Sequence, residues 1–457
     1  MTTHENTPAE AVKTGMAGWM VLTIVVTAPL PLGAARPWSA ALLGTLLGIA
    51  LLFWAAARLR DAAPPRIGLR RLAWPAGLYG IAVLWGLWQT LPWVPQAWMH
   101  PLWPEAAAVL GPLHGTVSIT PLAGRDAVMQ LLAYATTFFL VLQHGRDSSY
   151  AWRLIAAIAV TSALYAAYGI ANVIGGWEMI GPLDKWAYRG LVTGTLVNPN
   201  HFATLSGFGL LCCLALLQRD SMPPQQPALG RRIFWLCLIA ILILALLLTQ
   251  SRAGMFSTAC GILLLLSIIA WRRHNRALAW MLIASLAICA SGLLLVDSSQ
   301  TATWLASANH RFEVFQLTVV LTAERPLLGT GLGSFQDAFS AIRAVGMVPN
   351  WNAAHNTYLE LALELGIPAT LALLAAQGWL VWRCLHGMLR RRRHWLICAV
   401  ACAASLQLAL HSLLDFSAQI PAVAVCWAAL LGIGVAQSWS SRRKLSQPEL
   451  EAETSAA

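Results

Sequence analysis

The residues that could do chemistry gather where polar stretches meet long apolar runs. His355 and Asn356 stand at the end of one such stretch, 297–356, just before an apolar run. Imidazole is neutral near pH 7 and is the commonest general base, so we expect His355 to take a proton from a substrate. Glu360 and Glu364 follow Asn356 at intervals of four residues, and acidic side chains on a membrane helix are costly and seldom idle.

Arg252 lies in the very short connection LLLTQSRAGM between two apolar runs. Its planar guanidinium can pair with two oxygens of a diphosphate at once. Ser251 and Gly254 flank it, and both residues suit close approach of a polar ligand. The alternative is an arginine that snorkels to phospholipid headgroups. The hairpin is too tight to be an ordinary solvated connection, and we favour the diphosphate because Ser251 and Gly254 suit such a ligand.

A second junction, NPNHFA, brings polar residues to the start of another apolar run. Arg189, Asn200 and His201 either bind a ligand at this membrane edge or form a polar loop with a turn and a helix cap. Asp415 follows a histidine by one helical turn and is a weaker candidate of the same kind as His355.

The glycines Gly329, Gly331 and Gly333 form G-x-G-x-G inside the polar stretch 297–356. No strand precedes them and no βαβ unit can be drawn, so this is not a dinucleotide fingerprint. We expect turns here, whose backbone amides could also face a ligand. The chain contains no D-x-D, no G-x-x-x-x-G-K-[ST] and no H-E-x-x-H, so we expect neither a metal nor a cofactor.

The elements that must position these residues are membrane helices. Hydrophobic residues make up 58% of the 457 residues and charged ones only 11%, whereas a soluble chain carries about a quarter charged residues. Apolar runs of roughly 17–25 residues each match one helical crossing. We therefore predict an all-α polytopic membrane protein with about twelve transmembrane helices and one long periplasmic loop, 297–356, that contains short helices. The predicted spans are 17–35, 38–57, 74–92, 127–143, 151–172, 201–217, 233–250, 254–271, 278–296, 357–382, 395–414 and 419–438.

The charge pattern orients these spans. With a cytoplasmic N-terminus, 22 of the 30 Lys and Arg residues fall in inward segments and eight in outward ones, which is the positive-inside bias. We predict one transmembrane domain, 19–438, between cytoplasmic tails at 1–18 and 439–457. The net charge of +11 then faces anionic lipid headgroups, and no nucleic acid is expected. The first span could also be a cleaved signal peptide, although its length and two prolines favour a retained helix.

Four segments, taken together and in this order, carry a family resemblance. TQSRAG, RPLLGTGLGSFQDAF, AHNTYLELALELG and HSLLDFSAQIPA, separated by membrane spans, resemble the O-antigen ligase and O-antigen polymerase superfamily. NPNHFA is also similar to members found with exopolysaccharide clusters. The resemblance covers roughly 189–425.

This resemblance implies an inner-membrane glycosyltransferase. Such an enzyme takes a glycan from undecaprenyl diphosphate at the periplasmic face and passes it to an acceptor hydroxyl of lipid A–core, of another lipid-linked glycan or of a protein. By this similarity His355 would activate the acceptor, and the substrate-binding residues would be Arg252, Arg189, Arg311, Arg325, Asn356, Asn200 and His201. The family often has an acidic residue shortly before AHN, whereas this chain has Asn352, so His355 lacks a carboxylate nearby in sequence.

Two alternatives concern the function. A polysaccharide polymerase or a protein O-oligosaccharyltransferase of the same superfamily would carry the same motifs. A transporter of lipid-linked glycans would suit twelve spans, but transporters commonly show internal repeats and charged residues near the midplane. We find no repeat, and the polar residues gather at the outer face, so an enzyme is favoured.

The arginine asymmetry makes a testable prediction about topology. We expect engineered cysteines at Ser299 and Ser340 to react with an impermeant thiol reagent in intact spheroplasts, because the positive-inside bias places both in the periplasm. A cysteine at Ser446 should stay unlabelled. Labelling at Ser446 alone would reverse the orientation.

Overall fold

The protein is almost entirely helical. The computed structural model describes residues 15–221, 229–295, 302–342 and 351–439. In these ranges only β1 (Met179–Ile180) and β2 (Leu183–Asp184) are strands, paired antiparallel in one short loop. Most of both predicted tails, and the labelling sites Ser299 and Ser446, lie outside the described residues.

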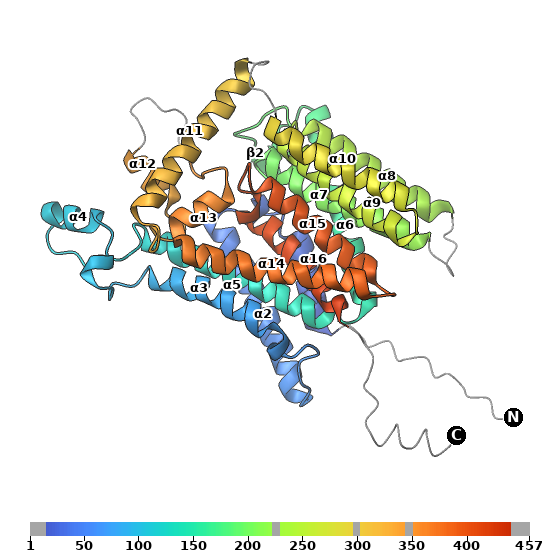
Figure 1. Ribbon diagram of the computed structural model, residues 1–457, viewed down its shortest axis with the longest axis horizontal. Helices are drawn as coiled ribbons and strands as arrows, with labels where there is room; N and C mark the ends of the chain where they lie inside the picture. Colours follow the sequence, from blue (N-terminus) through green and yellow to red (C-terminus); the bar gives the residue numbers. More distant parts are fainter. Residues whose placement is uncertain (1–14, 222–228, 296–301, 343–350, 440–457) are drawn as a thin grey trace.

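Helices run through every predicted span (Figure 1). Those before the β-loop are α1 (Met16–Thr27), α2 (Pro37–Arg60), α3 (Ala73–Trp88), α4 (Leu102–Leu110), α5 (Pro121–His144) and α6 (Ser148–Ile174), with short 3-10 turns η1 (Leu32–Ala34), η2 (Leu69–Leu72) and η3 (Gln96–Trp98). Those after it are α7 (Pro199–Asp220), α8 (Leu229–Leu248), α9 (Arg252–Arg272), α10 (Arg276–Leu295), α11 (Ala302–Glu324), α12 (Phe335–Ile342), α13 (Thr357–Leu365), α14 (Ile367–Arg390), α15 (Trp395–His411), η4 (Ser417–Gln419) and α16 (Pro421–Ser438).

The all-α polytopic class is confirmed, whereas the count of twelve spans is not. Among the described residues, seven helices are long and apolar enough to cross a membrane: α2, α5, α6, α7, α8, α9 and α16. Two predicted spans are each interrupted. The first is only the 12-residue α1 followed by a turn through Pro29 and Pro31. The span predicted at 357–382 is two helices, α13 and α14, which meet at Gly366 with its positive φ of 77°.

The described parts of the polar stretch 297–356 include one long helix rather than short helices alone. Its first described part is α11, a helix of 23 residues, and the shorter α12 follows after a glycine-rich turn. Figure 1 shows α11 rising away from the bundle. The sequence misled because α11 mixes polar and apolar residues and so lacks the continuous hydrophobicity by which spans are identified.

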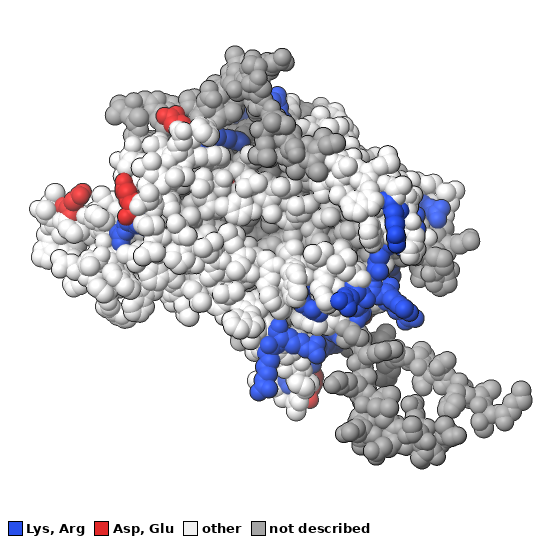
Figure 2. Space-filling model, in the orientation of Figure 1, with Lys and Arg blue, Asp and Glu red and all other residues white. Residues whose placement is uncertain are grey.

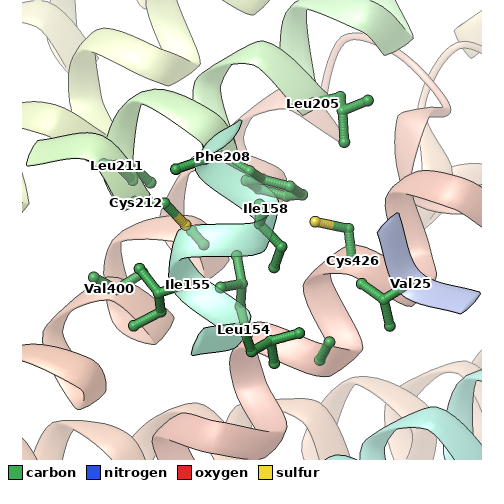
Figure 3. Packing of buried hydrophobic residues seen from close by; sticks show 14 of the residues in the cluster. Val25, Leu154, Ile155, Ile158, Leu205, Phe208, Leu211, Cys212, Val400 and Cys426 are labelled. Atoms are coloured by element: carbon green, nitrogen blue, oxygen red, sulfur yellow. The ribbon is translucent and has the colours of Figure 1, made fainter. Parts of the chain in front are cut away.

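The central helix is α16, whose side chains are buried along its whole length. It packs against α5, α14 and α15. Small residues fill it, and they let helices approach closely where lipid supplies no hydrophobic driving force. A Cβ at Gly434, for example, would lie 2.4 Å from the Cβ of Ala401 in α15. Figure 3 shows the adjoining core, in which side chains of α1, α6, α7, α15 and α16 meet.

Arginines gather at one end of the bundle (Figure 2). Several of them stack on tryptophans of other helices, and these pairs join helix ends to which the charge pattern assigns the same side. The guanidinium carbon and ring centroid are 5.2 Å apart for Arg153 and Trp19, 4.6 Å for Arg219 and Trp152, and 5.1 Å for Arg272 and Trp395. The end that carries His355 is the opposite one.

Candidate functional site

The candidate site is built around the carboxylate of Asp415, in the connection between α15 and α16. Asp415 is fully buried. Its Oδ1 accepts a hydrogen bond of 2.7 Å from the backbone N–H of Phe416, and its Oδ2 accepts one from the side-chain amide of Asn200. Two imidazoles face the same carboxylate: His355 Nδ1 is 3.3 Å and His201 Nε2 is 3.8 Å from Oδ1. Three segments far apart in the sequence therefore meet at one acidic group.

The NPN turn brings Asn200 and His201 to this point. The side chain of Asn198 caps α7 by accepting from the N–H of Asn200 at 2.8 Å, and Pro199 fits the first helical position because its missing N–H would have no partner there. The next two residues then lie in the first turn of α7, against Asp415. The segment therefore forms the helix cap that the sequence suggested and also brings Asn200 and His201 to Asp415. The His201 side chain is buried, so it faces the carboxylate and not an open surface.

Asn356 fixes the start of α13 beside the same connection. Its side-chain oxygen accepts from the N–H groups of Tyr358 and Leu359, each at 3.1 Å, and its amide nitrogen donates to Leu413 O at 3.2 Å. The Thr357 N–H also donates to Ser412 O at 2.9 Å. These bonds hold Asn356, the residue after His355, beside the connection between α15 and α16.

His355 itself has a backbone conformation that nonglycine residues seldom adopt. Its φ is +53°, in the left-handed region, and such strain persists only where the surroundings hold it. A hydrogen bond holds the backbone just before His355 in place, because the N–H of Ala354 donates to Glu360 Oε2 at 2.7 Å. The side chain of His355 is 18% exposed. With Nδ1 toward Asp415, the opposite ring nitrogen, Nε2, is the atom that can meet a substrate.

Aromatic rings hold both imidazoles in place. The ring of Phe416 meets His201 edge-on at a centroid distance of 4.6 Å and His355 at 5.0 Å. Trp351 meets the other side of His355 at 5.3 Å, also edge-on. This packing restricts rotation of the imidazoles and so keeps them directed at the carboxylate.

The electrostatics keep Asp415 ionised. Burial alone would raise its pKa, but the facing His201 and His355 hold the pKa of Asp415 well below its usual range. Arg311 adds positive charge close by, since its Nη1 donates to Leu414 O at 3.2 Å. A carboxylate that stays charged can orient an imidazole and stabilise it when it becomes protonated.

The predicted arginines do not all come to this centre. Arg252 is exposed at the first position of α9. Its small neighbours serve the fold: Ser251 caps α9 by accepting from the N–H of Gly254 at 3.1 Å. A Cβ at Gly254 would lie 2.4 Å from that of Ala203 in α7. We expected these two residues to make room for a ligand. In the structure Ser251 caps the helix and Gly254 allows α9 to pack on α7.

Arg189 and Arg325 bond to backbone carbonyls. Arg189 is exposed, and its Nε donates to Lys185 O at 2.9 Å. Arg325 donates to Trp98 O at 2.5 Å and to Met99 O at 3.2 Å. Arg325 thereby fastens the connection before α4 to the end of α11, which is a structural task.

The G-x-G-x-G loop does not offer its amides to a ligand. The carboxylate of Glu364 accepts from the backbone N–H groups of Gly333, Ser334 and Phe335. Gly331 has a φ of 108°, and a Cβ there would lie 2.1 Å from the hydroxyl of Ser118. Gly331 thus allows close packing of the loop on Ser118, and Gly329 allows it on α13, since a Cβ at Gly329 would lie 2.3 Å from Glu364 O.

The sequence did not identify Asp415 as the partner of His355. The motif HSLLDFSAQIPA contains it, but only the fold shows that it supplies the carboxylate missing before AHN. Among the described residues, no group of three or more His, Cys, Asp or Glu is placed to hold a metal ion.

The depressed pKa of Asp415 makes a testable prediction about stability. The ionised carboxylate stabilises the fold above the pKa of an unfolded aspartate, about 3.9, and this contribution is lost as pH falls through the lower folded-state pKa. We expect the Tm of the wild type to exceed that of Asp415→Asn at about pH 6 and the difference to shrink below about pH 4. Thermal unfolding in detergent measures this, with exposed Asp126→Asn as the control. A difference that is constant with pH would contradict the assignment.

A protein-family model matches part of the chain. Residues 237–374 match the Wzy_C family model, described as O-antigen ligase. This range runs from α8 into α14 and includes Arg252, Arg311 and His355, whereas His201 and Asp415 lie outside it. No curated protein matches the chain. The match agrees with the resemblance seen in the motifs, and the chain thus carries, over residues 237–374, a domain of the O-antigen ligase family.

Proposed function

We propose that this protein transfers a glycan from undecaprenyl diphosphate to an acceptor hydroxyl, with its site at the periplasmic face of the inner membrane. The family implies a membrane glycosyltransferase that uses a lipid-linked glycan donor and a glycan acceptor. The single observation that carries the proposal is the contact between His355 Nδ1 and Asp415 Oδ1, which are 3.3 Å apart. The pair lies at the end of the bundle opposite to the arginine-rich end.

His355 is the base in this proposal. The Asp415 carboxylate faces Nδ1 and favours the tautomer in which Nδ1 carries the proton, so Nε2 has the free lone pair. Nε2 takes the proton of the acceptor hydroxyl while the acceptor oxygen bonds to the anomeric carbon of the donor glycan. The bond from that carbon to the diphosphate oxygen breaks, and the electron pair leaves with the diphosphate. Asp415 stabilises the imidazolium that forms.

Arginines balance the charge of the leaving diphosphate. Arg252 at the start of α9 and Arg189 in the β-loop are both exposed, and a guanidinium pairs with two phosphate oxygens in a fixed geometry. Arg311 lies next to the Asp415 connection and is the third candidate. Preorganised positive charge of this kind stabilises the transition state without a divalent metal.

The acceptor distinguishes the members of the superfamily. We propose the ligase reaction, in which lipid A–core or a related glycan of lipopolysaccharide or exopolysaccharide assembly supplies the hydroxyl. A polymerase would use a second lipid-linked glycan, and a protein O-oligosaccharyltransferase would use Ser or Thr. Separation of lipopolysaccharide, secreted polysaccharide and glycoprotein from a clean deletion strain identifies which product is lost.

The first prediction concerns the base. His355→Ala should fold and insert normally yet lower kcat by ~10²–10⁴-fold, the usual contribution of a general base. The measurement is transfer by purified protein from a lipid-linked donor. His114→Ala is the control, because His114 is exposed on the connection after α4. Near-normal transfer by well-expressed His355→Ala would remove this residue from the mechanism.

The second prediction concerns the leaving group. Arg252→Lys should stay badly impaired although its charge is kept, because lysine offers one compact charge instead of a planar fork. Arg125→Lys, at an exposed position in the first turn of α5, should be silent. Turnover should also persist in excess EDTA. Full activity of Arg252→Lys would contradict bidentate binding, and activity lost in EDTA but restored by Mg²⁺ would contradict metal independence.

A further inference from the structure

Four arginines meet at Trp439, just after the C-terminal end of α16. Arg391 Nη1 donates to Trp439 O at 2.7 Å, and Arg146 Nη1 donates to the same oxygen at 3.1 Å. The guanidinium carbons of Arg71 and Arg383 lie over the Trp439 ring, 5.7 Å and 5.1 Å from its centroid. Arg71 comes from η2, Arg146 from the turn between α5 and α6, and Arg383 and Arg391 from the last turns and the C-cap of α14.

Close packing of α14 on α16 brings the cations together. A Cβ at Gly387 in α14 would lie 2.5 Å from the Cβ of Ser438 at the end of α16. Arg383 Nη2 also donates to Ser438 O at 3.5 Å. A larger residue at Gly387 would separate the two helix ends, so the convergence of the arginines is built into the helix packing.

The positive charge at this point exceeds what the helix end requires. The C-terminus of a helix carries roughly half a negative charge, which one arginine would neutralise. The salt bridges identified among the described residues at this end belong to Arg60, Arg153 and Arg231; none of these involves Arg71, Arg383 or Arg391. Burial lowers the pKa of Arg146, and the neighbouring charges of Arg391 and Arg71 lower it further.

The depth of the cluster indicates what kind of anion it would meet. The arginine–tryptophan pairs around it, such as Arg272 with Trp395, are typical of the boundary between hydrocarbon and water, where tryptophan concentrates. Phospholipid phosphates occupy this layer. An exposed arginine such as Arg71, held by a ring rather than by a carboxylate, can turn its donors toward such a phosphate.

We propose that Arg71, Arg383 and Arg391 form a binding site for the phosphate of an anionic phospholipid in the leaflet that surrounds the arginine-rich end. Trp439 is the floor of the site, and its carbonyl and ring hold the guanidinium groups in place. The ligand chemistry is a phosphate ester, which either a lipid or a soluble phosphate could supply. The proposal is independent of the glycosyl transfer reaction.

The experiment measures lipid retention by native mass spectrometry of the full-length protein in detergent. We titrate phosphatidylglycerol and, separately, phosphatidylcholine. Each arginine near an anionic surface contributes about fivefold to binding, so Arg71→Gln should weaken phosphatidylglycerol binding about fivefold and the Arg71→Gln, Arg383→Gln pair about 30-fold. Arg392→Gln is the matched control, because Arg392 is an exposed arginine directly beside Arg391. Phosphatidylcholine should bind weakly to all variants.

Competition identifies the source of the phosphate. If millimolar inorganic phosphate leaves phosphatidylglycerol bound, the site is a lipid site, and if it displaces the lipid from the wild type but not from the double variant, the site accepts soluble phosphate as well. Equal losses in Arg71→Gln and Arg392→Gln, or no loss in either, would overturn the proposal. The chain's own tail offers Glu449, Glu451 and Glu453. Binding that appears only when these three are changed to Gln would assign the site to the tail instead.

Should the double variant unfold, Arg71→Gln alone decides the proposal. Arg71 is exposed and touches the cluster through the Trp439 ring, so its loss should leave the helices packed. The Tm of Arg71→Gln without lipid should match that of the wild type, while phosphatidylglycerol should raise its Tm less. Equal stabilisation of both proteins by the lipid would refute the site.

Discussion

Burial of the Asp415 carboxylate is the constraint on which the site depends. An ionised group removed from water loses several kcal/mol of solvation unless donors replace the water. The N–H of Phe416 and the side-chain amide of Asn200 donate to it, and the imidazoles of His201 and His355 face it at 3.8 Å and 3.3 Å. Each of these must stay near the carboxylate, so one buried charge fixes the start of α7, the start of α13 and the α15–α16 connection relative to each other.

The surrounding loop transmits this constraint to the periphery of the bundle. Gln89, after α3, donates to Leu328 O at 2.7 Å and to Glu364 O at 2.9 Å, and it accepts from the N–H of Leu332 at 3.1 Å. Glu364 binds the next amides of the same turn. The glycine-rich turn is therefore fixed between α3 and α13, and α13 carries His355 at its start. A rigid frame of this kind suits a base that must hold one orientation.

Much of this architecture follows from local sequence. The helices could be predicted from the apolar runs, because a backbone with unpaired N–H and C=O groups is too costly in lipid and few structures other than helices avoid that cost. His355 and Asn200 were found because polar residues at helix starts stand out in an apolar chain. The partnership of His355 with Asp415 was not predictable, because it forms between segments about 60 residues apart in sequence and no local pattern encodes such a contact. The division at Gly366 was missed for the same reason. A glycine is needed there because Leu327 O, from a distant segment, lies 2.4 Å from where a Cβ of residue 366 would stand.

The arginines that the charge pattern assigns to the outer side differ in what surrounds them. The charge pattern predicts that these arginines lie on the outer side, where each would weaken the asymmetry that orients the chain, so each needs a reason to be there. Arg325 has a structural one, since it bonds the carbonyls of Trp98 and Met99. Arg252 and Arg189 are more exposed than Arg325, although Arg189 also donates to a backbone carbonyl, that of Lys185. In the proposed reaction, the base His355 is 18% exposed and lies beside the buried Asp415, while the exposed Arg252 and Arg189 supply positive charge for the diphosphate of the donor.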